Sequence, residues 1–432
     1  MLVTANRASR LGLVTALLVA LASPFSSFAD DNVSVQKGVL KRGAGDYTAI
    51  AITAQNVLRH GVSRDETIKT LDRISEVGGN AVCVDLVGMD PSGKSIDKQA
   101  AEALKELGAT VKDRYMTVIC RLFGPNAPTG RGYRVAAAKT AATTFQDVRQ
   151  IVFLIDGPSA EAAAKAFKKT APNVIVAAPD GGDVAVYTDP ASPPKTKPAV
   201  LFGALPPTLG DQVHFILPEG DSSYTRLDEA SVTPSERQPW TPDNSVLSAE
   251  ERAAGWIALF DGKSLNGWTV LGTNPNAWKA HDNMLERVDK GSRGLRSHDK
   301  YDNFILRFDW SLPQGGNNGV HLRSPRGGRE SKVGIEFQML GDFGQPVSKT
   351  CTGSIYDVVA PTANAVKPNG QWNTTEITMD HSHVVFILNG QKVIDVDMDK
   401  NDDLKLRIKN GFIVLTEHSA SVQYRNIRLK KL

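Results

Sequence analysis

The stretch from Asn317 to Leu340 constrains the fold most, because apolar and polar residues alternate along both of its halves. This alternation at every second residue is typical of a half-buried β-strand, whose successive side chains point to opposite faces. In the first half, Val320 and Leu322 are expected on one face, with His321 and Arg323 on the other.

The second half shows the same alternation and ends in a similar polar pair. Its apolar face is predicted to carry Val333, Ile335, Phe337 and Met339. Glu336 and Gln338 then share the opposite face with His321 and Arg323 of the neighbouring strand. Such a polar face suits a sugar-binding or acid/base site. Alternatively, Glu336 and Arg323 form a cross-strand ion pair that only fixes the register of the two strands.

The N-terminus has the three regions of a secretory signal. Arg7 and Arg10 precede an apolar run over residues 11–22, and a small-residue cleavage pattern ends at Ala29. We therefore expect residues 1–29 to be removed on export, leaving a periplasmic or extracellular protein. The alternative is an uncleaved anchor, but about a dozen apolar residues are short for a span of roughly 20. No later segment is predicted to cross a membrane.

Charge and cysteine content narrow the possible partners. The formal charge of the 432-residue chain is +3, and loss of Arg7 and Arg10 leaves 3 − 2 = +1. A nearly neutral protein is not expected to bind nucleic acid or anionic membranes generally. Of the three cysteines, Cys83 and Cys120 lie in predicted strands. They either form a disulfide after export or remain separate buried thiols.

An α/β domain is predicted for residues 30–218. Its expected strands are residues 48–53, 81–87, 115–123, 151–155, 174–178, 184–187, 199–202 and 213–217, and its expected helices are 63–76, 96–107 and 160–169. Apolar strands separated by helices indicate β-α units with a parallel sheet. Since the segments beyond residue 180 are too short and too rich in proline and glycine for further helices, we expect a degenerate (β/α) barrel or an open α/β sheet.

Polar residues follow several of these strands. They are Asp85, Asp90, Arg121, Asp156 and Asp180. Ligands of such folds gather at the carboxyl ends of the strands, and two carboxylates can flank a glycosidic bond. The simpler interpretation is that these aspartates cap the helices that follow.

The character of the chain changes after a linker predicted at residues 219–250. From residue 251 to 432, short alternating strands and Asn-Gly or Asp-Gly turns recur, and Asn389-Gly390 is a strong hairpin signal. Many such strands over one domain predict a two-sheet β-sandwich of the jelly-roll type.

Several ordered motifs in this second domain resemble one known family. They are Gly255-Trp256-Ile257-Ala258-Leu259-Phe260-Asp261-Gly262, Asn317-Asn318-Gly319-Val320, Gly334-Ile335-Glu336-Phe337-Gln338, Thr352-Gly353-Ser354-Ile355-Tyr356, Gln371-Trp372-Asn373, Leu388-Asn389-Gly390 and Tyr424-Arg425-Asn426-Ile427. Together they resemble the 3-keto-disaccharide hydrolase domain over about residues 255–432. One departure is Leu415-Thr416-Glu417-His418, because the family usually has Leu-Gln-Asp-His there.

The resemblance implies a concanavalin-like jelly roll that acts on glycosides whose sugar carries a ketone at C3. That ketone acidifies the proton on C2, so a base can remove it and the enolate can expel the oxygen on C1, after which water can add. Such a reaction requires a base, an electrophile at the ketone oxygen and an acid for the leaving group. We expect Glu336 and His418 to supply the base and acid, and Arg323 to stabilise the enolate.

The remaining candidates are residues that bind substrate or a metal. Hydrogen bonds to sugar hydroxyls are expected from Asn318, Gln338, Tyr356 and Asn373, and stacking on a sugar from Trp372. No cofactor is required by the sequence. A divalent metal could nevertheless stabilise the enolate, with His321, Glu336 and His418 as ligands.

Two other functions remain open from the sequence. The polar face could belong to a lectin-like module that binds polysaccharide without chemistry. The N-terminal domain could instead be the catalyst, if Asp85 and Asp156 face each other across an open cleft.

Overall fold

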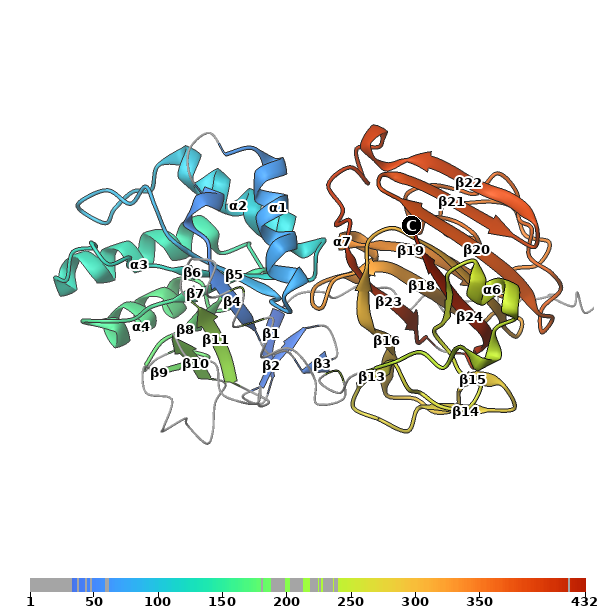
Figure 1. The fold of residues 1–432 in the computed structure, drawn as a ribbon. Helices are drawn as coiled ribbons and strands as arrows, with labels where there is room; N and C mark the ends of the chain where they lie inside the picture. The colour runs from blue at the N-terminus through green and yellow to red at the C-terminus, as the bar shows by residue number, and fades with distance from the viewer. Residues whose placement is uncertain are drawn as a thin grey trace, which may run out of the picture.

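The chain forms two lobes, a barrel and a sandwich (Figure 1). The computed structural model describes residues 33–36, 39–42, 45–46, 49–58, 62–179, 182–187, 199–202, 213–217, 224, 227, 236, 240–418 and 420–432. The predicted export signal and Asp180 lie outside these described residues.

Eight parallel strands build the first lobe. They are β4 (Ile50–Thr53), β5 (Ala81–Asp85), β6 (Thr117–Arg121), β7 (Ile151–Leu154), β8 (Ile175–Ala177), β9 (Ala185–Tyr187), β10 (Ala199–Phe202) and β11 (Val213–Leu217). β4 to β8 pair in sequence order, β9 to β11 do the same, and β11 pairs with β4. Ala177 in β8 also pairs in parallel with Val184, directly before β9. The two ends of the sheet therefore meet, and the predicted α/β domain is a closed barrel.

A helix follows each of the first four of these strands. They are α1 (Arg64–Glu76), α2 (Lys98–Lys112), α3 (Arg131–Phe145) and α4 (Ala160–Thr170), and the 3-10 helix η1 (Gln55–Leu58) precedes α1. The described residues between β8 and β11 contain no helix, and Tyr224 and Leu227 after β11 are helical. α3 was not predicted, because its buried face consists mainly of alanines, which give a weak apolar pattern.

The barrel has an outer and an inner apolar core. Helices and the outward side chains of the strands form the outer core, which includes Cys120. The inner core consists mostly of small residues and includes Cys83. The two thiols therefore lie on opposite faces of the sheet, and both are free. A small unpredicted sheet, β1 (Val33–Gln36), β2 (Val39–Arg42) and β3 (Gly45–Asp46), packs Val33 against the inner core.

The second lobe is a sandwich of two antiparallel sheets, as predicted. The larger sheet has the order β14 (Trp278–His281), β15 (Met284–Arg287), β24 (Gln423–Lys431), β17 (Phe304–Ser311), β20 (Asn373–Asp380), β21 (His383–Leu388) and β22 (Gln391–Asp397), with β12 (Trp256–Ala258) also paired to β24. The smaller sheet has the order β13 (Trp268–Gly272), β16 (Ser292–Tyr301), β23 (Gly411–Thr416), β18 (Asn317–Ser324) and β19 (Ile335–Leu340). Short helices are η2 (Asn244–Val246), α6 (Ala249–Ala253), α7 (Glu330–Val333) and η3 (Met398–Lys400).

Alternation along the strands explains this arrangement. Phe304, Leu306, Phe308 and Trp310 of β17 face one continuous core together with Phe337 of β19. Asn389 and Gly390 both have positive φ, of 51° and 82°, as the predicted tight hairpin requires. The smaller sheet is left with one face outside the core, and that face carries the candidate site.

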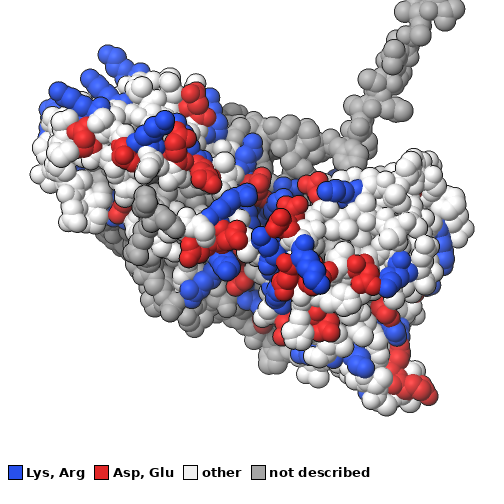
Figure 2. Space-filling model, turned by 90° about the horizontal axis from the view of Figure 1, so that it is seen from above, with Lys and Arg blue, Asp and Glu red and all other residues white. Residues whose placement is uncertain are grey.

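The surface agrees with the low net charge. Figure 2 shows Lys and Arg interspersed with Asp and Glu, and both signs gather along the boundary between the two lobes. Among the described residues, no helix combines the length and the apolar character that a membrane crossing needs.

Candidate functional site

β18 and β19 bring a histidine and a carboxylate together. The strands pair antiparallel with His321 directly opposite Glu336, and His321 Nε2 lies 3.5 Å from Glu336 Oε2. Both side chains are largely buried, with 14% and 7% of their surfaces exposed. The predicted polar face therefore exists, and an ion pair of restricted solvent access lies on it.

Gly319 makes room for the Glu336 carboxylate. A Cβ atom at Gly319 would stand 2.4 Å from Glu336 Oε1 and 3.1 Å from its Cγ. Only glycine lets the Glu336 side chain lie across β18 in this position. The Asn-Asn-Gly motif contains this residue, but sequence alone does not reveal what the glycine accommodates.

His418 follows β23 and is exposed to solvent. Neighbouring protein atoms nevertheless displace water around it and lower its pKa, an effect that Glu336 opposes and His321 strengthens. For His321, burial is the largest single effect and favours the neutral form, but the charge of Glu336, its hydrogen bond to His321 and the charge of Glu330 together raise the pKa above its ordinary value. Two histidines near one carboxylate are thus shifted in opposite directions, as in an acid and base pair.

Tyr356 and Gln338 adjoin the same carboxylate. The backbone N–H of Tyr356 donates to the Glu336 carbonyl at 3.0 Å. Burial raises the pKa of the Tyr356 hydroxyl, and the charge of Glu336 adds to the shift. Gln338 is 2% exposed and lies two residues along β19 on the face of Glu336. The site is therefore continuous along β19.

Several polar atoms around this face are buried without a hydrogen-bond partner. They are Asn318 Nδ2, His321 Nδ1, Gln338 Oε1 and Ser354 Oγ. Buried polar groups are normally paired, and leaving one unpaired costs about 1–3 kcal/mol. A set of such atoms beside an ion pair is what a binding site for a hydroxylated ligand offers before the ligand enters.

Arg323 does not belong to this face, so the prediction that it lies beside Glu336 is wrong. The strand register shifts between His321 and Ser324, and Arg323 has a φ of 48°. This irregularity turns the side chain away from the polar face, and it is 0% exposed. Its guanidinium donates to the carbonyls of Asp302 at 2.7 Å and His381 at 2.8 Å. Arg323 therefore ties together turns at the end of the sandwich.

Trp372 and Asn373 also lie elsewhere, next to and within the larger sheet. Asn373, the first residue of β20, is buried and accepts hydrogen bonds from Lys367 N and Asn389 Nδ2, both at 2.8 Å. Trp372 lies under the Arg425 guanidinium, whose carbon is 4.0 Å from the ring centroid. The structure does not bring either residue to the Glu336 face.

The departure from the family motif at residue 416 is compensated locally. Thr416 is buried, and its hydroxyl lies 3.3 Å from Asn318 Oδ1, to which it donates. β23 ends at Thr416, so strand alternation does not apply to Glu417. The Glu417 carboxylate lies 3.7 Å from Arg287, and its charge influences the pKa of His418. Glu417 is therefore a neighbour of the site.

The described residues contain no group of three His, Cys, Asp or Glu side chains that could hold a metal ion. His321 and Glu336 are adjacent, but His418 does not complete a ligand set with them in this geometry. The donor set therefore does not fit a three-ligand metal site, and the chemistry below is derived from the side chains alone.

The barrel residues named from the sequence are engaged with one another. Asp85 lies 3.3 Å from Arg121. Burial raises the pKa of Asp156, and Arg121 opposes that shift. Asp90 instead accepts hydrogen bonds from Ser92 and Ser95 within its own turn. The charge of Asp85 also raises the pKa of Asp156, so the two carboxylates interact and share Arg121 as a neighbouring cation.

Known proteins match the sandwich. A family described as "3-keto-alpha-glucoside-1,2-lyase-like domain" matches residues 255–430. The sandwich is similar to this family over nearly its whole length. The chain is also 25% identical, over 230 aligned residues, to the 3-keto-disaccharide hydrolase of Bacteroides thetaiotaomicron, covering 42% of this chain and 79% of that protein. These matches support a carbohydrate-active function for the sandwich.

Solved structures give weaker matches. A candidate glycosyl hydrolase from Parabacteroides distasonis is 24% identical, with a TM-score of 0.39, and covers 43% of this chain and 98% of its own. A glycoside hydrolase family 5 protein from Bacteroides vulgatus is 10% identical, with a TM-score of 0.37, and covers 89% of this chain and 92% of its own. These TM-scores are too low to carry a functional argument.

Proposed function

We propose that the sandwich cleaves 3-keto-glycosides by eliminating the group on C1 and then adding water. The observation that carries this proposal is the pair of oppositely shifted histidines, His321 and His418, near the Glu336 carboxylate. The similarity of the domain to a 1,2-lyase-like family and to a 3-keto-disaccharide hydrolase supports the same substrate class.

His418 is the base in this proposal. Its lowered pKa keeps the imidazole neutral near pH 7, and its exposure lets a substrate reach it. It removes the proton from C2, which the C3 ketone has acidified, and the electron pair forms an enolate. The C1–O bond then breaks as the enolate collapses, giving a C1=C2 double bond conjugated to the ketone.

His321 takes the role of the cation that the sequence assigned to Arg323. Glu336, 3.5 Å away, favours the protonated form of this imidazole, which can donate to the ketone oxygen or to the departing oxygen. Glu336 acts as the group that orients and charges His321. His321 gives its proton to the departing oxygen and regains one from the water that adds to C1. His418 is exposed, exchanges its proton with solvent and then protonates C2, which completes a net hydrolysis.

In this proposal, the buried polar atoms without hydrogen-bond partners bind the hydroxyl groups of the substrate. Gln338 Oε1 accepts a hydrogen bond, and Asn318 Nδ2 donates one. Both residues are at most 2% exposed, so each bond formed with a sugar removes an unpaired buried group. This preference for a hydroxylated ligand serves catalysis and simple binding equally, so turnover must separate them.

A turnover assay tests the proposal. Wild type, His418→Ala and Glu336→Gln are incubated with an aryl 3-keto-glucoside, with and without chelator, and release of the phenol is followed. His383→Ala is the matched control, because His383 is an exposed histidine of the larger sheet that pairs with Asp395. We expect release by wild type and the control, and loss in both site variants. Binding of the keto-glycoside without any release would replace this proposal by the lectin-like function.

We further propose that the protein acts after export, because the first 29 residues carry a signal pattern. The protein recovered from the periplasm or medium is expected to have the mass of a chain that begins at Asp30. Recovery of the intact N-terminus from the cytoplasm would contradict export.

A further inference from the structure

Residues 325–334 form the loop that joins the two site strands, β18 and β19. The last paired positions before it are Leu322 with Ile335 and His321 with Glu336. Its second half is held by the sandwich itself, because Arg407 donates to the carbonyls of Ser331 at 2.5 Å and Gly334 at 2.8 Å.

The first half of the loop is held by the barrel. Gly327 N donates to the Ser75 carbonyl at the end of α1, and Arg329 N donates to the Arg114 carbonyl after α2, both at 2.9 Å. The contact is close, since a Cβ atom at Gly327 would stand 2.8 Å from the Gly79 carbonyl oxygen. In Figure 1, α7 of this loop lies on the side of the sandwich that faces the barrel.

Charged side chains of the same loop lie close to the barrel and act on the site. The Arg329 guanidinium carbon lies 5.1 Å from the centroid of the Tyr115 ring in the barrel, and its charge also acts on Tyr356 in the site. The next residue, Glu330, lies 3.1 Å from Arg293, and its charge acts on His321. Residues 329 and 330 therefore connect the barrel contact to the acid and base groups.

We propose that the barrel is a positioning element of the sandwich site. Its turns after α1 and α2 hold residues 327–329, and so they set where Arg329 and Glu330 lie relative to His321, Glu336 and Tyr356. This inference rests on the proposed cleavage of 3-keto-glycosides for its kinetic prediction, but its structural part stands without that activity. Arg329 is a positioning residue here, because it acts through Tyr356.

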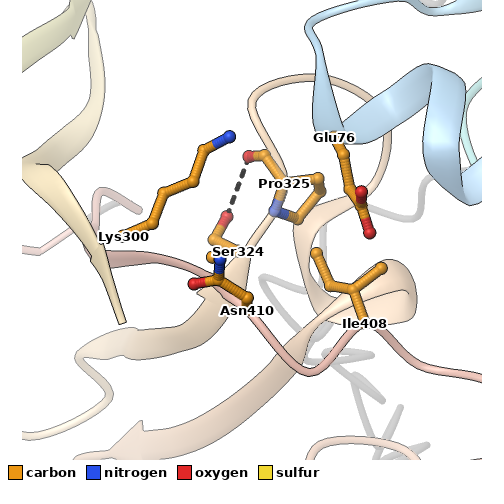
Figure 3. Close-up of a pocket in the computed structure, with 7 residues that line it drawn as sticks. Glu76, Lys300, Ser324, Pro325, Ile408 and Asn410 are labelled. Atoms are coloured by element: carbon orange, nitrogen blue, oxygen red, sulfur yellow. Dashed lines mark hydrogen bonds between the residues drawn. The ribbon is translucent and has the colours of Figure 1, made fainter. Parts of the chain in front are cut away.

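The rest of the seam between the lobes supports a fixed contact. Behind it, Asp72 and Arg114 of the barrel form a buried ion pair at 2.7 Å, and Asp72 attracts Arg407 of the sandwich while Arg114 repels it. A cavity of about 70 Å³ opens beside Glu76 and Lys300, with Ser324 and Ile408 on its wall (Figure 3). Sugar and drug-sized pockets are typically about 300–1,000 Å³, so this cavity fits a few waters and not the substrate.

Gly327→Val tests the proposal in the full-length protein. Gly327 lies outside the positive-φ region, so the substitution mainly adds a side chain against the barrel backbone. Gly130→Val is the matched control, because a Cβ at that barrel glycine meets nothing within 4 Å. Tryptophan fluorescence checks the fold of the sandwich, because all six tryptophans lie between residues 240 and 372.

We expect Gly327→Val to lower kcat/KM for the keto-glycoside by about 10- to 100-fold, since small misplacements at a site have effects of this size. Hydrogen exchange at residues 325–329 is expected to quicken in the same variant, with the tryptophan-reported unfolding unchanged. The control is expected to match wild type in both measurements.

Two variants of Arg329 test the same proposal if Gly327→Val does not fold. Arg329→Gln is expected to raise KM, and Arg329→Lys to recover part of the loss, because lysine keeps the charge without the planar guanidinium. Faster exchange with unchanged kcat/KM overturns the positioning role, and unchanged exchange overturns the barrel contact. An inactive wild type with faster loop exchange in Gly327→Val removes the proposed function and leaves the contact.

Discussion

Both lobes carry a cluster of charged side chains where a ligand could bind, but the charges within the two clusters are balanced differently. At the carboxyl ends of the barrel strands, Arg121 lies 3.3 Å from Asp85 and also offsets the burial of Asp156, so the charges neutralise one another. On the outer face of the smaller sheet, Gln338 keeps a buried polar atom without a partner beside the His321–Glu336 pair. Histidines whose pKa values are shifted in opposite directions beside one carboxylate therefore indicate acid and base chemistry more directly than carboxylates that share one cation.

The largest predicted effect is at His418. His418→Ala is expected to lower kcat for 3-keto-glycoside cleavage by about 10²- to 10⁴-fold, the usual contribution of a positioned base. Release of the aglycone under saturating substrate measures it. Added imidazole is expected to restore part of the rate, and an unchanged rate would remove His418 from the mechanism.

The pH profile is expected to be bell-shaped, with limbs on either side of the ordinary histidine pKa of about 6.5. Activity rises with pH as His418 loses its proton, and its lowered pKa puts this limb on the acid side. Activity falls as His321 loses its proton, and its raised pKa puts that limb on the alkaline side. The profile of kcat/KM checks this, and His321→Gln is expected to abolish the alkaline limb. An alkaline limb that survives in this variant would assign the acid elsewhere.

Gly319→Ala tests the space that the site requires. The added methyl group would displace the Glu336 carboxylate, so kcat/KM is expected to fall about 10- to 100-fold while the free energy of unfolding changes little. Parallel kinetic and thermal measurements separate the two effects. Equal loss of activity and stability would mean that Gly319 serves only the fold.

Arg323 and Asp85 should show the weakest kinetic effects. Arg323→Gln is expected to lower the free energy of unfolding by about 1–3 kcal/mol, because buried carbonyls lose their donor, while kcat per folded molecule stays within twofold. Asp85→Asn is expected to leave cleavage unchanged, because its cluster lies in the barrel. Chemical denaturation and aglycone release check both variants, and a large loss of kcat in Asp85→Asn would move catalysis to the barrel.

The sequence predicts most of the architecture, since continuous apolar strands and alternating strands leave distinct patterns. All eight barrel strands lie where the apolar runs place them, and His321 and Glu336 face each other as the alternation requires. Strands β12 to β16 were not predicted individually, because residues 256–301 mix aromatic and charged residues without sustained alternation.

The position of Arg323 could not be predicted, because a single irregularity between His321 and Ser324 reverses its face and leaves no sequence signal. Trp372 and Asn373 were assigned to the site by their motif, yet a motif carries no information about which sheet it joins. The contact between the barrel and residues 327–329 arises only when the two lobes pack together.

Cleavage of a 3-keto-glucoside in D₂O tests directly whether the C2 proton is removed during the reaction. Wild type is expected to release 3-keto-glucose with deuterium at C2, detected by NMR within one turnover and before uncatalysed exchange. Release of 3-keto-glucose with its original C2 proton would show direct attack at C1 and contradict the account.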